Sequence, residues 1–445
     1  MRDAVRLHRV AEQCLGGLGS SKATRLVLSL FFKAILGIAR VFHFETLDDC
    51  GFAILTGGTT VLGRNLLGGL IRAAPVRGVL DFVRRTEPTI ARATAVHVSI
   101  DEHAIARFTR KFQIRKGFHT IRNKHMKIEK VFCSFDVNSR KLLSVIVTRG
   151  NATLCAISDK LLRRIRPRAR GASVRTLLDA GAATNHTRLL ALAHQPNQVT
   201  IVRAPRRPAY RKRWAAIPKD QWTRHEEPGP FKAAAPKVVH LVDIRMRVAS
   251  DDVRTIVVRE QRQRGKDRWH ALWVFNDETT TALDILHEFR TRQHHEQRYR
   301  IMLHDAFVDT APSGYNKKSP NPRRPGFKQN SLTLYAWIAA LATNALDDLT
   351  QLLPSTFLHA HPRTLRRWLF NVKADIFLGN GTLLVTLKPK RLRALWLCLV
   401  QRANRHPVRI PWMDNRRLIL SIDLSKPTLH ATPRPEGAFD PPNAR

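Results

Sequence analysis

The first 90 residues alternate apolar patches of helical spacing with glycine breaks. The patches cover residues 24–41, 66–72 and 76–85. Apolar residues three and four positions apart share one face of a helix, so we predict a small helical domain over residues 1–90. Residues 16–24 hold glycines but lack the ending of a phosphate-binding loop, and we interpret them as a helix connector. The basic residues of these helices form either a DNA-binding face or a solvated one.

From residue 95 onward the pattern becomes that of strands. Apolar residues at positions 96, 98 and 100 alternate with polar ones and lead into Asp101, which we expect to close the strand. Residues 130–151 predict a hairpin that turns at Asn138 and Ser139, after a basic loop over 109–130. A helix over 156–165, a strand ending at Asp179, a helix over 185–193 and a strand over 198–205 follow. In a mixed α/β sheet such strand ends converge on the ligand side.

The rhythm of helices and strands is lost between residues 206 and 270. We predict a β-rich insertion there, with a basic, aromatic-containing loop over 206–222 and a hairpin after it. A strand at 270–277 and a helix at 286–305 complete a domain over residues 91–348, which includes a basic loop at 312–330 and most of an apolar helix at 331–353. A small basic α/β unit over 349–424 contains a hairpin turning at 379–381, and the tail 425–445 is predicted to be disordered. The fold class is α/β, a mixed sheet core flanked by helices.

Composition narrows the possible partners. The chain has 445 residues, a formal net charge of +41 and a pI near 11.4, with 43% hydrophobic residues along its whole length. It is therefore a folded, strongly cationic protein, and nucleic acid is the expected partner. The longest apolar run, residues 26–39, contains Lys33 and is shorter than the roughly 18 to 20 residues of a membrane span. We predict no membrane association, no signal peptide, and a cytoplasmic, nucleoid-associated location.

The five cysteines are scattered and form no CxxC pair, so neither a disulfide framework nor a zinc site is indicated. His294, His295 and His304 lack the companion ligands of a zinc site.

A stripe of three residues on the helix 286–305 carries candidate chemistry. Phe289, Arg292 and Glu296 are three and four residues apart and share one helical face. Alone, the Arg292–Glu296 pair is an ordinary surface ion pair worth about 0.3 to 0.5 kcal/mol. With Asp101 and Asp179, however, it makes three acidic residues in suggestive positions, and converging carboxylates need a cation. Mg²⁺ prefers oxygen ligands, and two such ions about 3.5 to 4 Å apart bind a scissile phosphate.

The alternative interpretation is structural. Asp101 is then a residue that starts a loop, and Asp179 forms a turn before Gly181. Neighbouring Glu102 and Glu288 are weaker candidates. Glu102 is off the strand-end register, and Glu288 lies about 80° around the helix from Glu296.

The ordered motifs resemble those of DDE transposases of bacterial insertion sequences, in the family-four-like group with a ribonuclease-H-like catalytic core. VSIDEH around Asp101 resembles the first motif, and LLDAGAAT around Asp179 resembles the second. The third motif of the group is Tyr, two residues, Arg, three residues, Glu, six residues, Lys. Phe289 stands at the Tyr position, Arg292 and Glu296 keep the spacing, and Leu303 stands at the Lys position. The resemblance covers about residues 91–348.

The resemblance implies a function and a set of roles. Asp101, Asp179 and Glu296 are expected to hold Mg²⁺, with Mn²⁺ as a substitute, and Arg292 to orient the glutamate or contact phosphate. The enzyme is expected to cut double-stranded DNA at inverted-repeat ends and join it to target DNA, as a homodimer in the DNA complex. Arg300, four residues after Glu296, and His304 are the nearest basic replacements for the missing lysine.

Basic residues of two loops are the predicted DNA contacts, because phosphate groups attract exposed Lys and Arg. With Arg300, the candidates are Lys317, Lys318, Arg323, Arg324, Lys328, Arg211, Lys212 and Trp214. Trp214 and Trp222 either stack on bases or are buried. Two other functions stay open: a catalytically inactive, transposase-derived DNA-binding protein, and a basic RNA-binding or ribosome-associated protein.

Overall fold

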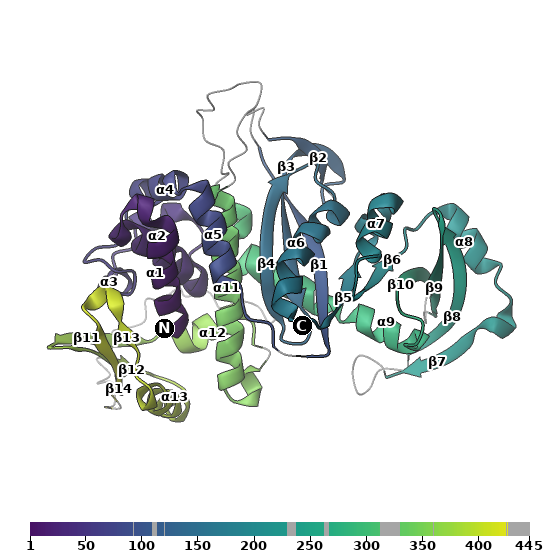
Figure 1. Cartoon of the computed structure of the whole chain (residues 1–445). Coiled ribbons are helices and arrows are strands. Elements are labelled where there is room, and N and C mark those ends of the chain that lie inside the picture. The colour runs from purple at the N-terminus through teal and green to yellow at the C-terminus, as the bar shows by residue number, and fades with distance from the viewer. Residues whose placement is uncertain are drawn as a thin grey trace, which may run out of the picture. The chain divides into compact units, whose positions relative to one another are not determined.

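The chain forms two compact units in a computed structural model. One unit is Arg2–Arg363, and the other is Thr364–Arg445 together with Met1 (Figure 1). The structure describes residues 1–91, 93–108, 114–119, 121–228, 237–261, 267–311, 330–358, 360–423 and 425. Within these residues, no helix is both long and apolar enough to cross a lipid bilayer.

The first 90 residues are helical, as predicted. Their helices are α1 (Arg2–Leu15), α2 (Ser20–Leu36), α3 (Cys50–Leu55), α4 (Arg64–Ala73) and α5 (Val76–Thr86), of which α2, α4 and α5 match the predicted patches. These three helices pack against the predicted apolar helix, α11 (Asn330–Leu352), on which Trp337 donates its indole N–H to Thr86 over 2.7 Å. On the same helix, Asn344 bonds the backbone of Leu142 in β4. Helix α11 therefore joins the helical layer to the sheet within one unit.

A large mixed sheet forms the centre of the Arg2–Arg363 unit. Its strands are β1 (Ala95–Ala106), β2 (Lys116–His119), β3 (Lys124–Asp136), β4 (Lys141–Arg149), β5 (Ser173–Leu178), β6 (Gln198–Arg203), β7 (Thr223–Glu227), β8 (Lys237–Val248), β9 (Asp251–Glu260) and β10 (Arg268–Phe275). The order is β2-β3-β1-β5-β6-β10-β9-β8-β7, and β4 pairs with β3. Strands β1, β5 and β6 are parallel, whereas β3 is antiparallel to β1 and β10 is antiparallel to β6. The α/β class and the hairpin β3–β4 are thus confirmed.

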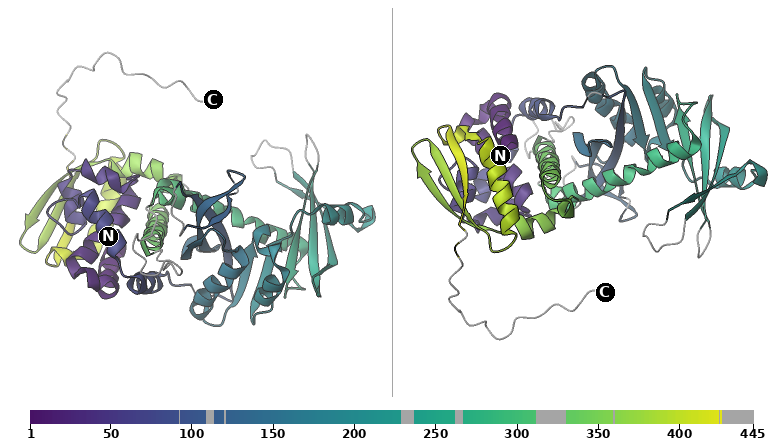
Figure 2. Two further views of the ribbon diagram at one scale, coloured as in Figure 1. Left: turned by 90° about the horizontal axis from the view of Figure 1, so that it is seen from above. Right: turned by 90° about the horizontal axis from the view of Figure 1, so that it is seen from below.

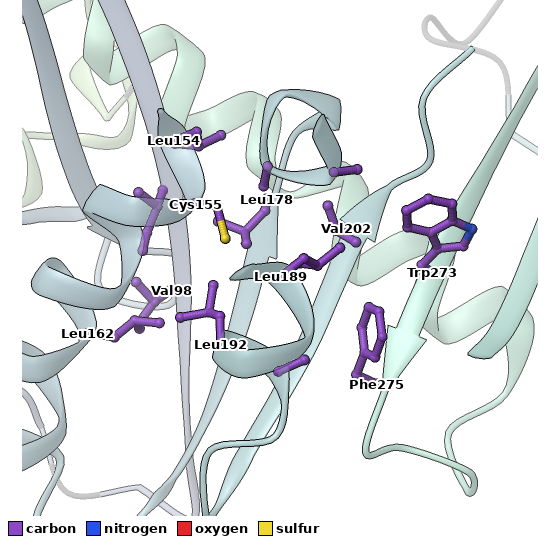
Figure 3. Packing of buried hydrophobic residues seen from close by; sticks show 14 of the residues in the cluster. Val98, Leu154, Cys155, Leu162, Leu178, Leu189, Leu192, Val202, Trp273 and Phe275 are labelled. Atoms are coloured by element: carbon purple, nitrogen blue, oxygen red, sulfur yellow. The ribbon is translucent and has the colours of Figure 1, made fainter. Parts of the chain in front are cut away.

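Helices cover both faces of this sheet because side chains along a strand alternate between its faces. One face packs against α6 (Leu154–Ala169) and α7 (His186–Ala193), with Leu178 and Trp273 in the shared core (Figure 3). On the other face, neighbouring Leu177 packs with Ile285 and Phe289 of α9 (Ala282–Arg290). Figure 2 shows this helical segment running along the sheet. Helix α10 (Arg292–Arg300) and a π-helical turn, Ile301–Asp305, continue it after a break at Thr291.

Three boundaries differ from the prediction. Strand β1 does not end at Asp101 but continues to Ala106, because its antiparallel ladder with β3 extends beyond its parallel ladder with β5. The basic loop expected at 109–130 contains β2 and the start of β3. The loop expected at 206–222 contains helix α8 (Pro208–Ala215). The predicted hairpin β8–β9 is present and extends the main sheet through β10.

The Thr364–Arg445 unit is a small α/β structure. Its sheet has the order β11-β12-β14-β13 and carries helix α13 (Arg393–Arg405). Strands β11 (Lys373–Gly379) and β12 (Thr382–Lys388) form the predicted hairpin, and Gly381 in its turn has a φ of 69°, which favours glycine. Strands β13 (Arg409–Ile410) and β14 (Arg416–Ile422) complete the sheet. The predicted tail lies outside the described residues, apart from residue 425.

Candidate functional site

The backbone register brings Asp101 and Asp179 together. The parallel ladder between β1 and β5 begins at Ala95 opposite Ser173 and ends at Ile100 opposite Leu178. Asp101 directly follows Ile100, and Asp179 directly follows Leu178. Neighbouring strands lie about 4.8 Å apart. The two carboxylates therefore emerge side by side at the carboxyl end of the parallel strands, where α/β sheets place their ligands. Asp101 does not end its strand as the sequence predicts, but lies within β1 and pairs with Cys133 of β3.

Arg292 connects this edge to the helix above it. Its Nη1 donates to Asp101 Oδ2 over 3.0 Å, and its Nη2 donates to Glu296 Oε1 over 2.6 Å. The guanidinium carbon lies 5.9 Å from the centre of the Phe289 ring, so the three stripe residues meet as their spacing predicted. Arg292 is buried, and its fork geometry suits two carboxylates at once. One guanidinium thus holds the helix residue Glu296 and the strand residue Asp101 in place.

Burial and like charges make Asp101 reluctant to ionise. Burial is the largest effect and raises the pKa of Asp101 from 3.8 to about 6, against the opposing influence of Arg292 and of the Glu102 backbone N–H. The charges of Asp179 and Glu296 raise the pKa of Asp101 further. The charges of Asp179 and Glu296 therefore add to the effect of burial on Asp101.

The second aspartate has an unused ligand atom. Asp179 Oδ1 is buried and makes no hydrogen bond to the described residues, and it lies 3.9 Å from Arg203 Nη1. An orphaned buried oxygen is costly unless a ligand satisfies it. Oxygen donors alone suit a hard divalent ion such as Mg²⁺. Among the residues that the structure describes, however, no three His, Cys, Asp or Glu side chains are grouped closely enough to hold one metal ion. Asp101 and Glu296 are instead both bonded to Arg292.

His295, which lacks the companions of a zinc ligand, supports the site by its packing. It is fully buried below the site, its Nδ1 lies 2.9 Å from Ser99 Oγ, and its ring stacks on Phe135 at 5.2 Å. Burial lowers the pKa of His295 to about 3, so the ring is neutral. Its role is to fix α10 on β1 and β3. The spacing of His295 and Tyr299, four residues apart on the buried face, was a signal for this packing.

Neither proposed replacement for the missing lysine is paired with Glu296. Leu303 is buried in the core, and Arg300 is exposed on α10. His304 Nδ1 lies 3.4 Å from Asp309 Oδ2. In the described part of the chain, the cation bound to Glu296 is Arg292.

The two weaker acidic candidates have structural partners. Glu102 pairs with Lys130 over 2.9 Å, next to the site. Glu288 accepts from Arg175 and lies 2.9 Å from His97 Nδ1, which ties α9 to β5 and β1. These pairs hold the sheet and helix that position Asp101.

The predicted DNA contacts have different outcomes. Lys317, Lys318, Arg323, Arg324 and Lys328 lie outside the described residues.

On α8, Arg211 and Lys212 are exposed, as a phosphate contact requires. Trp214 is fully buried and stacks with Tyr210 at 6.2 Å, so the prediction that it contacts DNA is wrong. The physical reason is helical geometry: Tyr210 and Trp214, four residues apart, form the inward face of α8, and the cations form the outward one.

No protein-family model matches the sequence, and no curated protein is significantly similar to it. Among solved structures, the chain is similar to the piggyBac transposase in a cryo-EM structure of its synaptic complex with hairpin DNA. The identity is 12%, the TM-score is 0.43, and the match covers 78% of this chain and 70% of that chain. A similarity of this degree does not support a function, so a functional proposal rests on the residues of the site.

Proposed function

We propose that the protein is a DNA transposase with a ribonuclease-H-like core, which cuts DNA at insertion-sequence ends and joins those ends to a target. The observation that carries the proposal is the register of β1 and β5, which places Asp101 beside Asp179 at the ligand edge of the sheet. Glu296 is bound to the same arginine as Asp101, which supports a site that includes all three acidic residues. The net charge of +41 fits a polyanionic substrate.

The site residues fit a divalent metal ion by their chemistry. The pKa of Asp101 is raised to about 6, so a bound cation would favour its ionised form, and Asp179 Oδ1 makes no hydrogen bond. Bound Mg²⁺ or Mn²⁺ supplies a Lewis acid that activates water or a 3′-hydroxyl and stabilises the leaving oxygen. Glu296 joins the two aspartates when its bond with Arg292 opens. Phosphate is an alternative partner for the Arg292 fork.

A cleavage assay tests this proposal. The substrate is a duplex that contains the repeats flanking the reading frame, with Mg²⁺ or Mn²⁺ present. Asp101→Asn, Asp179→Asn and Glu296→Gln are each expected to abolish cleavage and strand transfer. The matched control is Glu278→Gln, a surface carboxylate whose partner is Arg245. If all three site variants cleave like the parent chain, the site assignment is wrong.

A second candidate is a transposase-derived DNA-binding protein without catalysis. The observation that favours it is Arg292, which already neutralises Asp101 and Glu296 without a metal. This candidate predicts tight, salt-sensitive DNA binding, no metal-dependent nicking by the wild type, and no thermal stabilisation by Mn²⁺. The transposase predicts stabilisation that Asp179→Asn removes, because a ligand that binds only the folded state stabilises it.

The resemblance further implies a homodimer that holds two DNA ends. Sedimentation of the chain with and without an end-containing duplex tests this. A one-to-one complex that cleaves both strands would exclude the dimer.

A further inference from the structure

The hairpin formed by β2 and the start of β3 exposes apolar side chains at its tip. Ile121, in the turn, is 78% exposed, and Phe118 is 44% exposed. Phe108, which follows β1, is also 78% exposed, and the Arg122 guanidinium lies 5.1 Å from the centre of its ring. Turns normally present polar residues, so large apolar side chains at a hairpin tip indicate a binding surface. We call residues 115–119 and 121–127 the ribbon.

Cations surround these apolar side chains. Arg115, Lys116, Arg122 and Lys124 are exposed, and residues 109–128 contain no Asp or Glu. Such a surface repels basic partners and attracts phosphate groups. The mixture of exposed cations with a few exposed apolar side chains is typical of elements that enter a DNA groove.

The ribbon is held firmly at its base. A Cβ atom on Gly117 would lie 2.2 Å from the Gly150 carbonyl oxygen, so the two backbones are in close contact. The Arg107 N–H donates to the Lys127 carbonyl over 2.9 Å, and the Ile128 N–H donates to the Arg115 carbonyl over 3.2 Å. Its apolar tip is therefore presented by a fixed two-stranded element.

The ribbon extends beyond the edge that carries the acidic residues. Asp101 lies opposite Cys133 in β3, and Lys124, near the tip of the ribbon, is nine residues farther along that strand. At about 3.3 Å per residue this separation is about 30 Å, or about nine base pairs at 3.4 Å each. Figure 1 shows β2 beside this far end of β3. A duplex that lies along β3 from Asp101 would therefore reach Lys124 after about nine base pairs.

We infer that the ribbon is a DNA-distorting element, in which the exposed cations bind phosphates and Ile121 wedges between two stacked base pairs. A two-stranded ribbon fits a DNA groove, and apolar side chains that enter a base step unstack it. The inference rests on the proposed function only in taking DNA as the partner. It does not require cleavage.

The first test measures the phosphate contacts. The affinity of the full chain for a generic 40-base-pair duplex is measured between about 50 and 300 mM salt. The slope of log K against log salt is negative, and each lost phosphate contact makes it less steep by about 0.9, so Arg122→Gln/Lys124→Gln is expected to make it less steep by about 1.8. The charge-matched control is Lys160→Gln/Arg163→Gln on α6, which leaves the slope unchanged. An unchanged slope in the ribbon variant, or an equal loss in the control, overturns the inference.

The second test measures the wedge without a known binding sequence. A closed circular plasmid is relaxed by topoisomerase in the presence of the protein, and its linking number is compared with that of the free plasmid. The wild type is expected to lower the linking number, because unstacking unwinds the duplex. Ile121→Ser removes the change while its affinity stays within about threefold of the parent. The matched control is Leu66→Ser, an aliphatic residue 50% exposed on α4, and it keeps the change.

Two outcomes contradict the wedge. One is a linking number that Ile121→Ser leaves as in the wild type. The other is a change in sedimentation of the free protein in this variant, which would assign the tip to a contact between two copies of the chain. Thermal unfolding serves as the folding check, since an exposed side chain contributes little to stability.

Asp101→Asn separates this inference from the proposed function. It is expected to lose cleavage and keep both the salt slope and the linking-number change. If the ribbon variants behave as expected and no form of the chain ever cleaves DNA, the transposase proposal fails and the ribbon stands. If cleavage depends on the acidic residues and Ile121→Ser unwinds DNA like the wild type, the wedge fails and the transposase proposal stands.

Discussion

Asp101→Asn is expected to stabilise the protein while abolishing cleavage, and the stabilisation should depend on pH. The pKa of Asp101 is raised from 3.8 to about 6, so between these values the folded state binds more protons than the unfolded state. The free energy of unfolding therefore falls as pH rises through this range and is level above it. At about 1.36 kcal/mol per pKa unit, the full loss is about 3 kcal/mol. Asparagine cannot ionise and escapes this loss.

The measurable part lies between pH 4.5 and 7. An unfolded aspartate is already mostly ionised at pH 4.5, so the stability difference between Asp101→Asn and wild type should grow by about 2 kcal/mol across this interval. Urea unfolding, followed by the fluorescence of buried Trp214, Trp273 and Trp337, measures it. The control is Asp277→Asn, because hydrogen bonds and Arg175 lower the pKa of Asp277 to about 2. Its stability difference should be flat over the same interval, since both folded and unfolded forms are ionised throughout.

Two results would refute the reasoning. A difference for Asp101→Asn that does not change with pH would mean that the pKa of this carboxyl is not raised. A difference that grows toward pH 4.5 would mean that the Arg292 ion pair outweighs burial. With saturating Mg²⁺, the pH dependence of the wild type should shrink, because a bound cation favours the ionised carboxylate.

Three further predictions concern other residues. Arg292→Ala leaves two carboxylates without their cation, so it should lower the melting temperature, and Mg²⁺ should restore it in part; Arg175→Ala, which breaks a comparable structural pair, should gain nothing from Mg²⁺ in the same thermal scan. Trp214→Ala should lower the free energy of unfolding in urea by about 3 to 5 kcal/mol and leave DNA affinity unchanged, whereas Lys212→Ala should lower DNA affinity and leave the free energy of unfolding unchanged. Gly117→Ala should disrupt the ribbon, so this variant should lose the linking-number change and keep a cooperative unfolding transition. If the variant unwinds DNA like the wild type, Gly117 does not anchor the ribbon.

Local spacing predicted much of the site because helical geometry is short-range. Arg292 and Glu296 meet as four-residue neighbours, and Phe289 lies under the same guanidinium. The alternating pattern before Asp101 and the apolar run before Asp179 also gave the two strands. Their parallel pairing in register required the tertiary fold. No spacing in the sequence states that Ile100 lies opposite Leu178.

The errors arose where one element has two kinds of neighbour. Strand β1 was expected to stop at Asp101 because its parallel partner stops there, but β3 keeps pairing with it as far as Ala106. The cations around Trp214 suggested a solvent-exposed loop, although Tyr210 and Trp214 already carried the four-residue spacing of a buried helical face. The pairing of Asp101 with Arg292 joins residues 191 positions apart, which local pattern cannot reveal.

Arg292 binds two carboxylates in the structure, and we expect it to exchange them for DNA phosphate if the proposed function is right. In the metal-free arrangement its guanidinium binds Asp101 and Glu296, and Asp179 keeps an unsatisfied oxygen. A DNA phosphate is an alternative anionic partner for that guanidinium, and transfer of Arg292 to phosphate would leave Glu296 and Asp101 able to hold a metal ion. Metal and DNA should therefore bind with positive coupling, and by linkage each should raise the affinity of the other equally. Titrating Mn²⁺ with and without a duplex measures this coupling. Its absence in the wild type would leave Arg292 as a permanent structural cation and favour the non-catalytic protein.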